Sequence, residues 1–475
     1  MEVSTLTTAL AERLSNHDIL RLAEQDIPSY WPSDPATLAS TANIGSVTFG
    51  TGHSVYRSAI LPAIEEAQCE VILVTCFWAR SDTSDDLADT LHKLAVKASK
   101  ARTTIRVRIY FSSSSLLQKL LHTPSVDGKT YPPDTWQSTF GLPSPEELQG
   151  LDLEIKSVFV LPFSVMHPKF IIIDRHKVFL PSCNVSWEEW FEGCLELNGP
   201  VVEQFVRFWR SFWAAFRDFA FPGTATTTSQ KNIDTRRQPS NASLLATRKV
   251  SLADIPSIFL PSPHHQNPHL RLPWQPPAQP PPTPLNLTLL TLFARATKTI
   301  FIQTPNLTAQ PVLAALLGAL KRGVNLHVMT SEKLMVLEQL VTAGTTNARC
   351  MHWLRNQHQQ LLQQQRHPHT ATLLENDLES GLLGQASKPG RLTIEYHRSR
   401  TAGDRAHAEP TQSHLKLTII DDRVVVHGSG NMDRASWFTS QELGVAFVSE
   451  EFVHSIRSGL EEAMKGRSEV VYDSR

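Results

Sequence analysis

The chain has 475 residues, of which 41% are hydrophobic and 19% charged, and its formal net charge at pH 7 is −1. This length allows about three domains, or a duplicated two-domain chain with insertions. The apolar content excludes a largely disordered polypeptide, and the near-zero charge argues against a dedicated nucleic-acid binder, which usually has a strongly basic balance.

No targeting or membrane-spanning segment is expected. Residues 1–10 lack the basic segment and long apolar run of a secretory signal, and no stretch approaches the roughly 18 uninterrupted apolar residues of a membrane-spanning helix. The five cysteines are scattered and odd in number, which favours reduced thiols over a disulfide framework. We therefore expect a cytoplasmic protein whose only contact with membranes would be peripheral.

Helices and strands alternate in the first half of the chain, residues 46–221, which follows an N-terminal extension of residues 1–45. Helical apolar spacing is followed by runs of β-branched and aromatic residues that are typical of buried strands. The predicted elements are a helix over 55–68, a strand over 70–78, a helix over 85–100 and a strand over 104–111.

A second half, residues 286–465, repeats this alternation. Its predicted elements are a helix over 289–298, a strand over 299–304, a helix over 310–322 and a strand over 324–329. Alternating elements of this length imply an α/β fold, with a mixed sheet flanked by helices in each half.

Three further segments complete the predicted organisation. Residues 222–285 are rich first in Ser and Thr and then in Pro and His, which predicts an exposed linker. A Gln/His-rich insertion is expected over about 345–390, and residues 466–475 form a C-terminal tail.

Each half contains the pattern H-x-K-x-x-x-x-D, followed after six residues by a small-residue turn that ends in Asn. The residues of the two copies are His167, Lys169, Asp174, Ser182 and Asn184 in the first, and His414, Lys416, Asp421, Ser429 and Asn431 in the second. Imidazole can attack phosphorus or protonate a leaving oxygen, while ammonium and amide groups neutralise and orient phosphoryl oxygens. A duplicated set of this kind indicates phosphodiester cleavage.

An acidic residue follows each turn at a similar spacing. The turn Asn and a later Phe are 21 residues apart in both copies (205 − 184 and 452 − 431), and Glu196 and Glu442 lie 12 and 11 residues after the Asn. We interpret these two acids as equivalent, with a one-residue shift in the connecting loop, and keep Glu192 as the alternative to Glu196.

The doubled motif with its turns resembles the phospholipase D superfamily, and within it the cardiolipin synthases and phospholipases D. The resemblance covers residues 46–221 and 286–465. It implies two phospholipase D-like α/β sandwich halves that pack about a pseudo-two-fold axis, as an intramolecular pseudo-dimer in a monomer. It also implies one shared cleft and a mechanism that proceeds through a covalent phosphohistidine without a metal or cofactor.

The resemblance also implies a role for each site residue. His167 would attack phosphorus, and His414 would protonate the leaving oxygen and then deprotonate the water or alcohol that resolves the intermediate. Three groups of residues would assist: Lys169, Lys416, Asn184 and Asn431 holding phosphoryl oxygens, Ser182 and Ser429 shaping the turns, and Glu196 and Glu442 fixing the histidine tautomers. Asp174 and Asp421 would support the fold of the site.

One residue departs from the family pattern. Pro181 stands where the turn of the second copy has Gly428, and proline fixes φ and lacks an N–H. If the glycine needs a positive φ, the first turn cannot copy the second. The chain would then be a catalytically impaired lipid- or nucleic-acid-binding paralogue.

The resemblance does not identify the phosphodiester that is the substrate. The leading hypothesis is hydrolysis or transfer of the phosphatidyl group of a glycerophospholipid, because the chain resembles cardiolipin synthases in length and in the segment Gln303-Thr-Pro305. A nuclease acting on DNA or RNA is the alternative, although the simple nucleases of the superfamily carry one motif per chain.

Several other patterns have two interpretations. The aromatic face over 205–219 could lie in a lipid interface, but a core helix is favoured because the pattern stops at a Pro-Gly pair. Aromatic residues that follow the turns could line an acyl pocket, stack on bases or pack: Trp187, Trp190, Phe191, Trp437 and Phe438. A metal site is the less favoured interpretation of one group of histidines, and an exposed low-complexity stretch is favoured: His264, His265, His269, His358, His367 and His369. Recognition of an anionic headgroup or a nucleic-acid phosphate is the less favoured interpretation of a second group, and a solvated charge run is favoured: Arg398, Arg400, Arg405 and His407.

Overall fold

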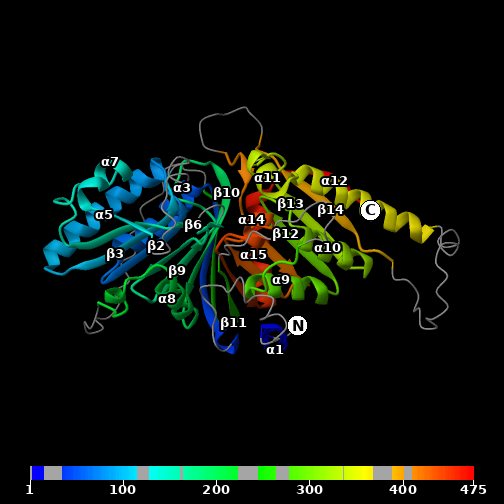
Figure 1. Ribbon diagram of the computed structural model, residues 1–475, viewed down its shortest axis with the longest axis horizontal. Coiled ribbons are helices and arrows are strands. Elements are labelled where there is room, and N and C mark those ends of the chain that lie inside the picture. The colour runs from blue at the N-terminus through cyan, green and yellow to red at the C-terminus, as the bar shows by residue number, and fades with distance from the viewer. Residues whose placement is uncertain are drawn as a thin grey trace.

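The computed structural model describes residues 3–14, 35–114, 128–160, 164–222, 244–263, 278–334, 336–366, 388–400 and 409–475. Its two halves lie side by side, each with a twisted sheet and flanking helices, and β11 (Leu244–Ser262) lies between them (Figure 1). The α/β class predicted from the alternating elements is confirmed, with a large mixed sheet flanked by helices.

The first half contains the predicted elements close to their expected bounds. Ser81 caps the long helix through its side chain, as expected for a helix start. The elements are β1 (Ala39–Gly50), α3 (Gly52–Val55), the π-helical turn η2 (Tyr56–Ile60), α4 (Leu61–Glu66), β2 (Glu70–Phe77), α5 (Asp82–Ala101), β3 (Ile105–Ser113), β4 (Lys129–Tyr131), η3 (Pro133–Thr135), α7 (Trp136–Phe140), β5 (Leu151–Ser157), β6 (Phe159–Val160), β7 (Ser164–Val165), β8 (Phe170–Ile173), β9 (Lys177–Pro181), β10 (Trp190–Asn198), α8 (Val201–Phe212) and η4 (Phe216–Asp218).

The second half repeats this order after β11. Its elements are α9 (Pro284–Arg295), β12 (Thr299–Thr304), α10 (Gln310–Lys321), β13 (Asn325–Thr330), α11 (Val336–Ala343), α12 (Asn347–Arg366), β14 (Leu392–His397), β15 (Gln412–Ser413), β16 (Leu417–Ile420), β17 (Val424–Gly428), α14 (Arg434–Phe438), β18 (Glu442–Val448), α15 (Glu450–Met464) and β19 (Ser468–Asp473). Within the described residues, β1 is preceded by α1 (Val3–Leu14) and η1 (Pro35–Leu38).

Strand pairing shows that the two halves are internal repeats. In the first half the pairing order is β5-β3-β2-β8-β9-β10-β1, and in the second it is β14-β13-β12-β16-β17-β18-β11. In both, the first three strands are parallel and the rest are antiparallel. Because β1 pairs with β11, the two sheets join at matching positions, as a pseudo-two-fold relation requires.

The prediction of a linker over residues 222–285 is wrong for its central part. Strand β11 lies within it and pairs with β1 on one side and with β18 on the other. Its apolar residues, including Ile258, Phe259 and Leu260, are fully buried. The Ser/Thr-rich and Pro-rich sequences on either side obscured this short apolar run, and its partners are distant in the sequence.

The terminal segments also join the fold. Strand β1 begins inside the predicted extension 1–45, and Arg13 of α1 donates a hydrogen bond to Thr291 of α9 at 2.8 Å. Strand β19 lies in the predicted tail and pairs with β14. The predicted insertion contains the 20-residue helix α12.

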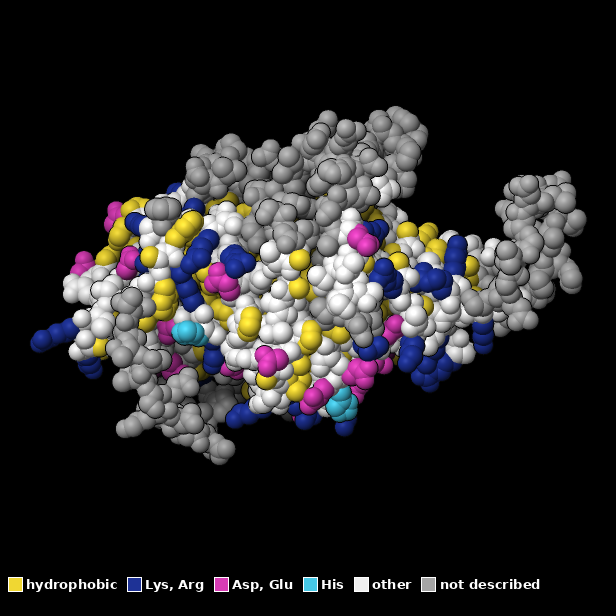
Figure 2. All heavy atoms as spheres, turned by 90° about the horizontal axis from the view of Figure 1, so that it is seen from below, with side chains coloured by type: hydrophobic (Ala, Val, Ile, Leu, Met, Phe, Trp, Pro, Cys, Tyr) yellow, Lys and Arg dark blue, Asp and Glu magenta, His cyan; other side chains and the backbone are white. Residues whose placement is uncertain are grey.

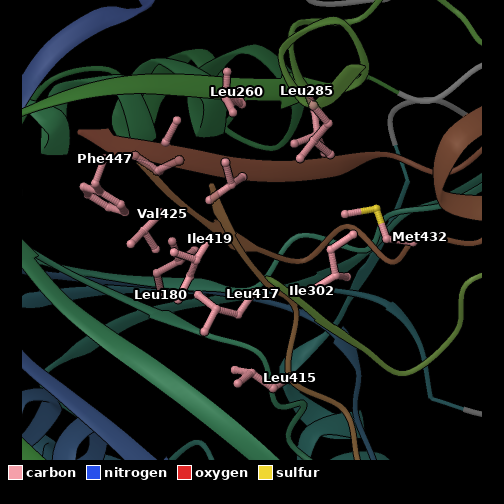
Figure 3. Packing of buried hydrophobic residues seen from close by; sticks show 14 of the residues in the cluster. Leu180, Leu260, Leu285, Ile302, Leu415, Leu417, Ile419, Val425, Met432 and Phe447 are labelled. Atoms are coloured by element: carbon pink, nitrogen blue, oxygen red, sulfur yellow. The ribbon is translucent and has the colours of Figure 1, made fainter. Parts of the chain in front are cut away.

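The core explains the apolar patterns of the strands. In β2, Val71 and Leu73 pack on the side of α5, whereas Ile72 and Val74 belong to a second cluster that includes α8, as expected for a strand buried on both faces. This second cluster crosses between the halves, so Leu180 packs near Leu417 and Ile419 (Figure 3).

The aromatic segment after residue 205 forms part of this core. Phe205, Phe208, Trp209 and Trp213 are at most 1% exposed, and the rings of Phe205 and Phe259 are 5.1 Å apart. The core interpretation of this helix is therefore confirmed. None of the helices in the described ranges is long and apolar enough to cross a membrane.

The surface carries charges of both signs. Acidic and basic side chains are both spread over the face seen in Figure 2. This mixture agrees with the formal net charge of −1.

A buried ion-pair cluster joins the end of the first half to its sheet. The Arg108 guanidinium donates hydrogen bonds to Asp218 at 2.7 and 3.0 Å, and both side chains are 1% exposed. Arg108 also binds Asp152, whose side chain is 52% exposed.

This cluster predicts two unequal effects on stability. Asp218→Ala leaves a buried guanidinium without its main partner, so we expect the free energy of unfolding to fall by about 3–5 kcal/mol. Asp152→Ala, the matched control, removes a solvated partner and is expected to cost less than about 1 kcal/mol. Urea denaturation of both variants measures the difference, and equal losses would contradict the buried role of Asp218.

Candidate active site

The two H-x-K pairs stand immediately before β8 and β16. In each pair the Lys ammonium donates to the backbone carbonyl of its own His, at 2.9 Å for Lys169 and 2.7 Å for Lys416. Both lysines are almost fully buried, at 1% and 4% exposure. Alternation along an extended segment places His and Lys of each pair on one face.

The backbone of each His is bound by the opposite half of the chain. The His167 N–H donates to the Gln441 carbonyl at 3.0 Å, and the His414 N–H donates to the Phe191 carbonyl at 2.9 Å. The second contact continues the parallel pairing of β10 with β15. The motifs therefore meet where the two halves join.

Each imidazole is also bound by a carboxylate from the opposite half. His167 Nδ1 lies 2.9 Å from Glu442 Oε2, and His414 Nδ1 lies 2.7 Å from Glu192 Oε1. Both acids are buried, at 0% and 3% exposure. Because a carboxylate is an acceptor, each of these contacts favours the tautomer that has the proton on Nδ1 and the lone pair on Nε2.

The turn serines complete this arrangement. Ser429 Oγ donates to Glu442 Oε2 at 2.5 Å, and Ser182 Oγ donates to the matching oxygen of Glu192. In each hydrogen-bonded series the Ser and Glu come from one half and the His comes from the other, so the two series cross the junction in opposite directions. The serines thus orient the acids as well as shape the turns.

The prediction that Glu196 binds a catalytic histidine is wrong, and Glu192 takes this place. Glu196 accepts a hydrogen bond from Ser46 at 2.9 Å and pairs with Lys177 at 2.7 Å, with a quarter of its side chain exposed. The equal spacing from Asn to Phe in the two copies led to the wrong acid, because a difference in loop length is cancelled by an opposite difference in the following segment. The first copy has a short loop and a long strand β10, whereas the second has a loop with α14 and a shorter strand β18.

The two motif aspartates hold the fold of the site, as expected. Asp174 accepts the backbone N–H groups of residues 68–70 at 2.7–2.8 Å, at the start of β2. Asp421 accepts those of residues 297–299, at the start of β12. Both have a positive φ, near 50°, in the hairpin that follows the motif strand.

Pro181 does not distort the first turn. Ser182 N–H donates to the Gly193 carbonyl at 2.8 Å, and Ser429 N–H donates to the Leu443 carbonyl at the same distance. Gly428 does not use a positive φ; a Cβ there would lie 2.2 Å from the Leu443 carbonyl oxygen. Close packing therefore explains the glycine, and the condition under which Pro181 would disrupt the turn is not met.

The two turn asparagines present unsatisfied acceptors. The side-chain Oδ1 atoms of Asn184 and Asn431 are buried and have no hydrogen-bond partner among the described residues. The Asn431 amide donates to Asp433 Oδ2 at 3.0 Å. Unpaired buried polar atoms are rare in folded proteins and are expected where a ligand or water binds.

Burial dominates the electrostatics of the histidines. It lowers the pKa of His167, against the attraction of Glu442, and lowers that of His414 further, with Lys416, Lys169 and His167 adding to the effect. Burial thus favours the neutral form of both imidazoles when the site holds no substrate. A neutral imidazole has the lone pair that a nucleophile or base requires.

Burial has the opposite effect on the carboxyl that faces His414. It raises the pKa of Glu192 to about 7, against the attraction of Lys416 and a hydrogen bond from Ser182. Burial also lowers the pKa of Lys416 to about 7, against the attraction of Glu192. This ammonium lies 2.9 Å from both ring nitrogens of His414.

The aromatic residues after the turns divide into packing residues and one site residue. Phe191, Trp437 and Phe438 are at most 3% exposed and pack in the core. Trp187 is 68% exposed. The Trp190 ring lies 4.7 Å from that of His414, measured between centroids.

The histidine and arginine tracts do not form a site within the described ranges. The expectation of exposure is wrong for His358, which is buried against the Gly390 carbonyl at 2.8 Å. Arg398 pairs with Glu332 and Glu469, and Arg400 donates to the Lys465 carbonyl. Seven residues of these tracts lie outside the described residues: His264, His265, His269, His367, His369, Arg405 and His407.

Sequence reasoning missed the crossed pairing and one further histidine. Buried His427 lies 3.1 Å from the Lys416 carbonyl through Nδ1 and 3.1 Å from the Leu180 carbonyl through Nε2, so it links the two halves behind the site. The apolar strand sequence around His427 does not indicate this contact.

Comparisons with known proteins agree with this geometry. A family model described as "Cardiolipin synthase, PLD-like domain" matches residues 289–464. Phosphatidylserine synthase from Haemophilus influenzae Rd KW20 superposes with a TM-score of 0.53 at 14% identity, covering 91% of this chain and 90% of that chain. No curated protein sequence matches the chain.

Two other solved structures are more distant. Nuc from Salmonella typhimurium, a phospholipase D family member, has a TM-score of 0.26 at 16% identity and covers 40% of this chain and 91% of its own. Polyphosphate kinase from Porphyromonas gingivalis has a TM-score of 0.46 at 9% identity and covers 90% of this chain and 49% of its own.

The duplicated sheet order and the crossed His–Glu pairs define an α/β protein of the phospholipase D type. The family match and the phosphatidylserine synthase fold confirm the resemblance found in the motifs. Residues 289–464 match the phospholipase D-like family model, and the chain as a whole has the fold of the phosphatidylserine synthase.

Proposed function

We propose that the protein is a phosphodiesterase or phosphatidyltransferase that hydrolyses or transfers the phosphatidyl group of glycerophospholipids through a covalent phosphohistidine. The observation that carries this proposal is the crossed arrangement, in which each half supplies an H-x-K pair and the acid that binds the other half's histidine. Neither half alone holds a histidine together with the acid that binds it.

In the first step, His167 Nε2 attacks phosphorus and forms a P–N bond. The Nδ1 proton stays directed at Glu442, which stabilises the positive charge that develops on the ring. The P–O bond to the leaving alcohol breaks, and His414 in its protonated form donates a proton to that oxygen.

In the second step, neutral His414 removes a proton from water or from an acceptor alcohol. The resulting oxygen attacks phosphorus, the P–N bond breaks, and His167 returns to its neutral form. Water gives phosphatidic acid and an alcohol acceptor gives a new phosphodiester, so one site supports both outcomes.

The lysines and asparagines would stabilise the phosphoryl group. Lys169 and Lys416 are buried cations beside the two imidazoles, and the amides of Asn184 and Asn431 lie in the turns that hold the glutamates. Positive charge in a low-dielectric site is expected to stabilise the charge of the transition state. The mechanism therefore uses protein groups where other phosphodiesterases use metal ions.

Two observations favour a phospholipid over a nucleic acid. The matching family model and the superposed structure carry the names cardiolipin synthase and phosphatidylserine synthase, both of which make phospholipids. The formal net charge of −1 does not favour a polyanion. A cytoplasmic location and peripheral membrane contact stay predictions, and α8 would not make that contact because its aromatic face is buried.

The test is a comparison of substrates. The protein is incubated with phosphatidylglycerol or phosphatidylcholine vesicles, with and without added alcohol, and in parallel with single-stranded DNA. Release of phosphatidic acid or a transfer product supports the proposal. DNA cleavage with inert vesicles would establish the nuclease instead, and binding without turnover would indicate a non-catalytic paralogue.

Removal of metals is a separate prediction. Since every charge in the proposed mechanism is supplied by side chains, we expect turnover of phosphatidylglycerol to stay within about twofold in excess chelator. The rate is measured before and after dialysis against the chelator. Loss of activity that a divalent cation restores would overturn the metal-free mechanism.

A further inference from the structure

Three successive residues of β10 hold His414. The Phe191 carbonyl accepts its backbone N–H, and the Glu192 carboxylate accepts its Nδ1 proton. Trp190, the first residue of the strand, lies with its ring centroid 4.7 Å from the imidazole and its plane at 47° to it. The indole is half-buried, so it forms one wall beside the reacting ring.

His167 has no aromatic residue at the position that corresponds to Trp190 in the other half. The backbone and acid contacts of His167 come from Gln441 and Glu442, so the position equivalent to Trp190 is Ser440. A serine side chain cannot supply an aromatic face. The imidazole of His167 is also more open, at 15% exposure against 5% for His414.

The charges around His414 mostly oppose its protonation. Lys416, Lys169 and His167 disfavour a positive charge on the ring. The Glu192 carboxylate, which is bound to Nδ1, favours that charge. An aromatic face attracts cations and contributes most where water is excluded. The indole therefore favours the protonated ring at the site where the lysines disfavour it.

We propose that Trp190 is a positioning residue that holds the ring of His414 and stabilises its protonated form, as the proton-transferring role proposed for His414 requires. This assignment rests on the proposed phosphodiesterase function for its kinetic consequences. Its effect on His414 itself does not depend on that function.

The kinetic test uses two leaving groups. An alkoxide that leaves from phosphatidylglycerol needs a proton, whereas p-nitrophenolate, released from bis(p-nitrophenyl) phosphate, does not. Trp190→Leu is expected to lower kcat for phosphatidylglycerol in mixed micelles by about 10–100-fold, since general acid catalysis contributes about 10²–10⁴-fold. Release of p-nitrophenolate in the first turnover should change by less than about threefold, because that step needs no acid.

The second step should then become visible. Since His414 also activates water, Trp190→Leu should show a burst of about one p-nitrophenolate per active site followed by slow turnover. Trp190→Phe keeps a ring and should recover most of the rate. Trp187→Leu, the matched control three residues earlier, removes an exposed indole and should behave like the unaltered protein.

A titration of the histidine distinguishes the failure of this assignment from the failure of the proposed function. The imidazole Cε1 resonances of isotopically labelled protein are followed against pH, with the His414 signal identified by its loss in His414→Asn. The pKa of His414 should be lower in Trp190→Leu than in Trp190→Phe, whether or not any phosphodiester is cleaved. An unchanged titration would overturn the proposal, as would an equal rate loss for both leaving groups or an equal loss in Trp187→Leu.

Discussion

Replacing His167 with alanine is expected to abolish turnover of phosphatidylglycerol and to leave no phosphorylated enzyme with any substrate. The variant lacks the atom that forms the P–N bond, and removal of a nucleophile costs at least about 10³-fold in rate. His414→Ala should be as slow with phosphatidylglycerol, because the alkoxide would leave without a proton. With bis(p-nitrophenyl) phosphate, however, it should accumulate a phosphohistidine at His167.

The measurement is rapid acid quench followed by mass spectrometry of the phosphorylated peptide. His176→Ala is a suitable control, because this histidine is exposed in the hairpin after β8 and lies within the same motif region. Phosphate on His414, or a phosphoenzyme that persists in His167→Ala, would reverse the assignment of the two roles.

Glu192→Gln is expected to lower kcat by about 10²–10³-fold, because the amide no longer compensates the charge on a protonated His414. Glu196→Gln should change kcat by less than about twofold, since the side chain pairs with Lys177 away from the imidazoles. The two glutamates are four residues apart on one strand, which makes them a matched pair. Equal losses would show that the crossed Glu–His pairing does not serve catalysis.

The same substitution should also change how stability depends on pH. Burial raises the pKa of Glu192 from 4.5 to about 7, so between these values the folded protein holds a proton that the unfolded chain has lost. Stability from this group is therefore complete below pH 4.5 and is lost as the pH rises through 7, by about 3–4 kcal/mol in total. Glu192→Gln removes this loss.

Urea denaturation between pH 5 and about 8 measures the effect. The variant should become more stable relative to the unaltered protein as the pH rises, while its activity stays low. A constant difference across the range would mean that Glu192 is ionised throughout and that its charge is already compensated in the folded state.

The grouping of the motif side chains could be predicted because it depends on residue types at short spacing. An H-x-K pair before an apolar strand places both side chains on one face wherever the strand lies, and the Ser and Asn of the turn follow at a fixed distance. Asp174 and Asp421 were also interpreted correctly, since each ends a strand where a hairpin begins.

The acids could not be assigned in this way, because spacing along the chain does not report strand register. The equal distance of 21 residues from Asn to Phe in both copies combines a short loop with a long β10 in one and a long loop with a short β18 in the other. Only the pairing of Cys194 with Pro181 and of Gly444 with Gly428 shows that Glu192 and Glu442 are equivalent.

Local composition also failed to predict two strands of the sheet. Strand β11 lies between low-complexity sequences, and β19 occupies what looked like a short tail, yet both are paired in the sheet. Their stability comes from partners that are distant in the sequence, and local propensity carries little of that information.

The repeat, the α/β class and the His, Lys, Ser and Asn residues of both motifs could be predicted from the sequence, since these depend on local periodicity and side-chain chemistry. Three features became known only from the structure: which acid binds which histidine, the crossing of these partners between the halves, and the contact of Trp190 with His414. These are contacts across the junction of two sheets, and their geometry is set by strand register and packing.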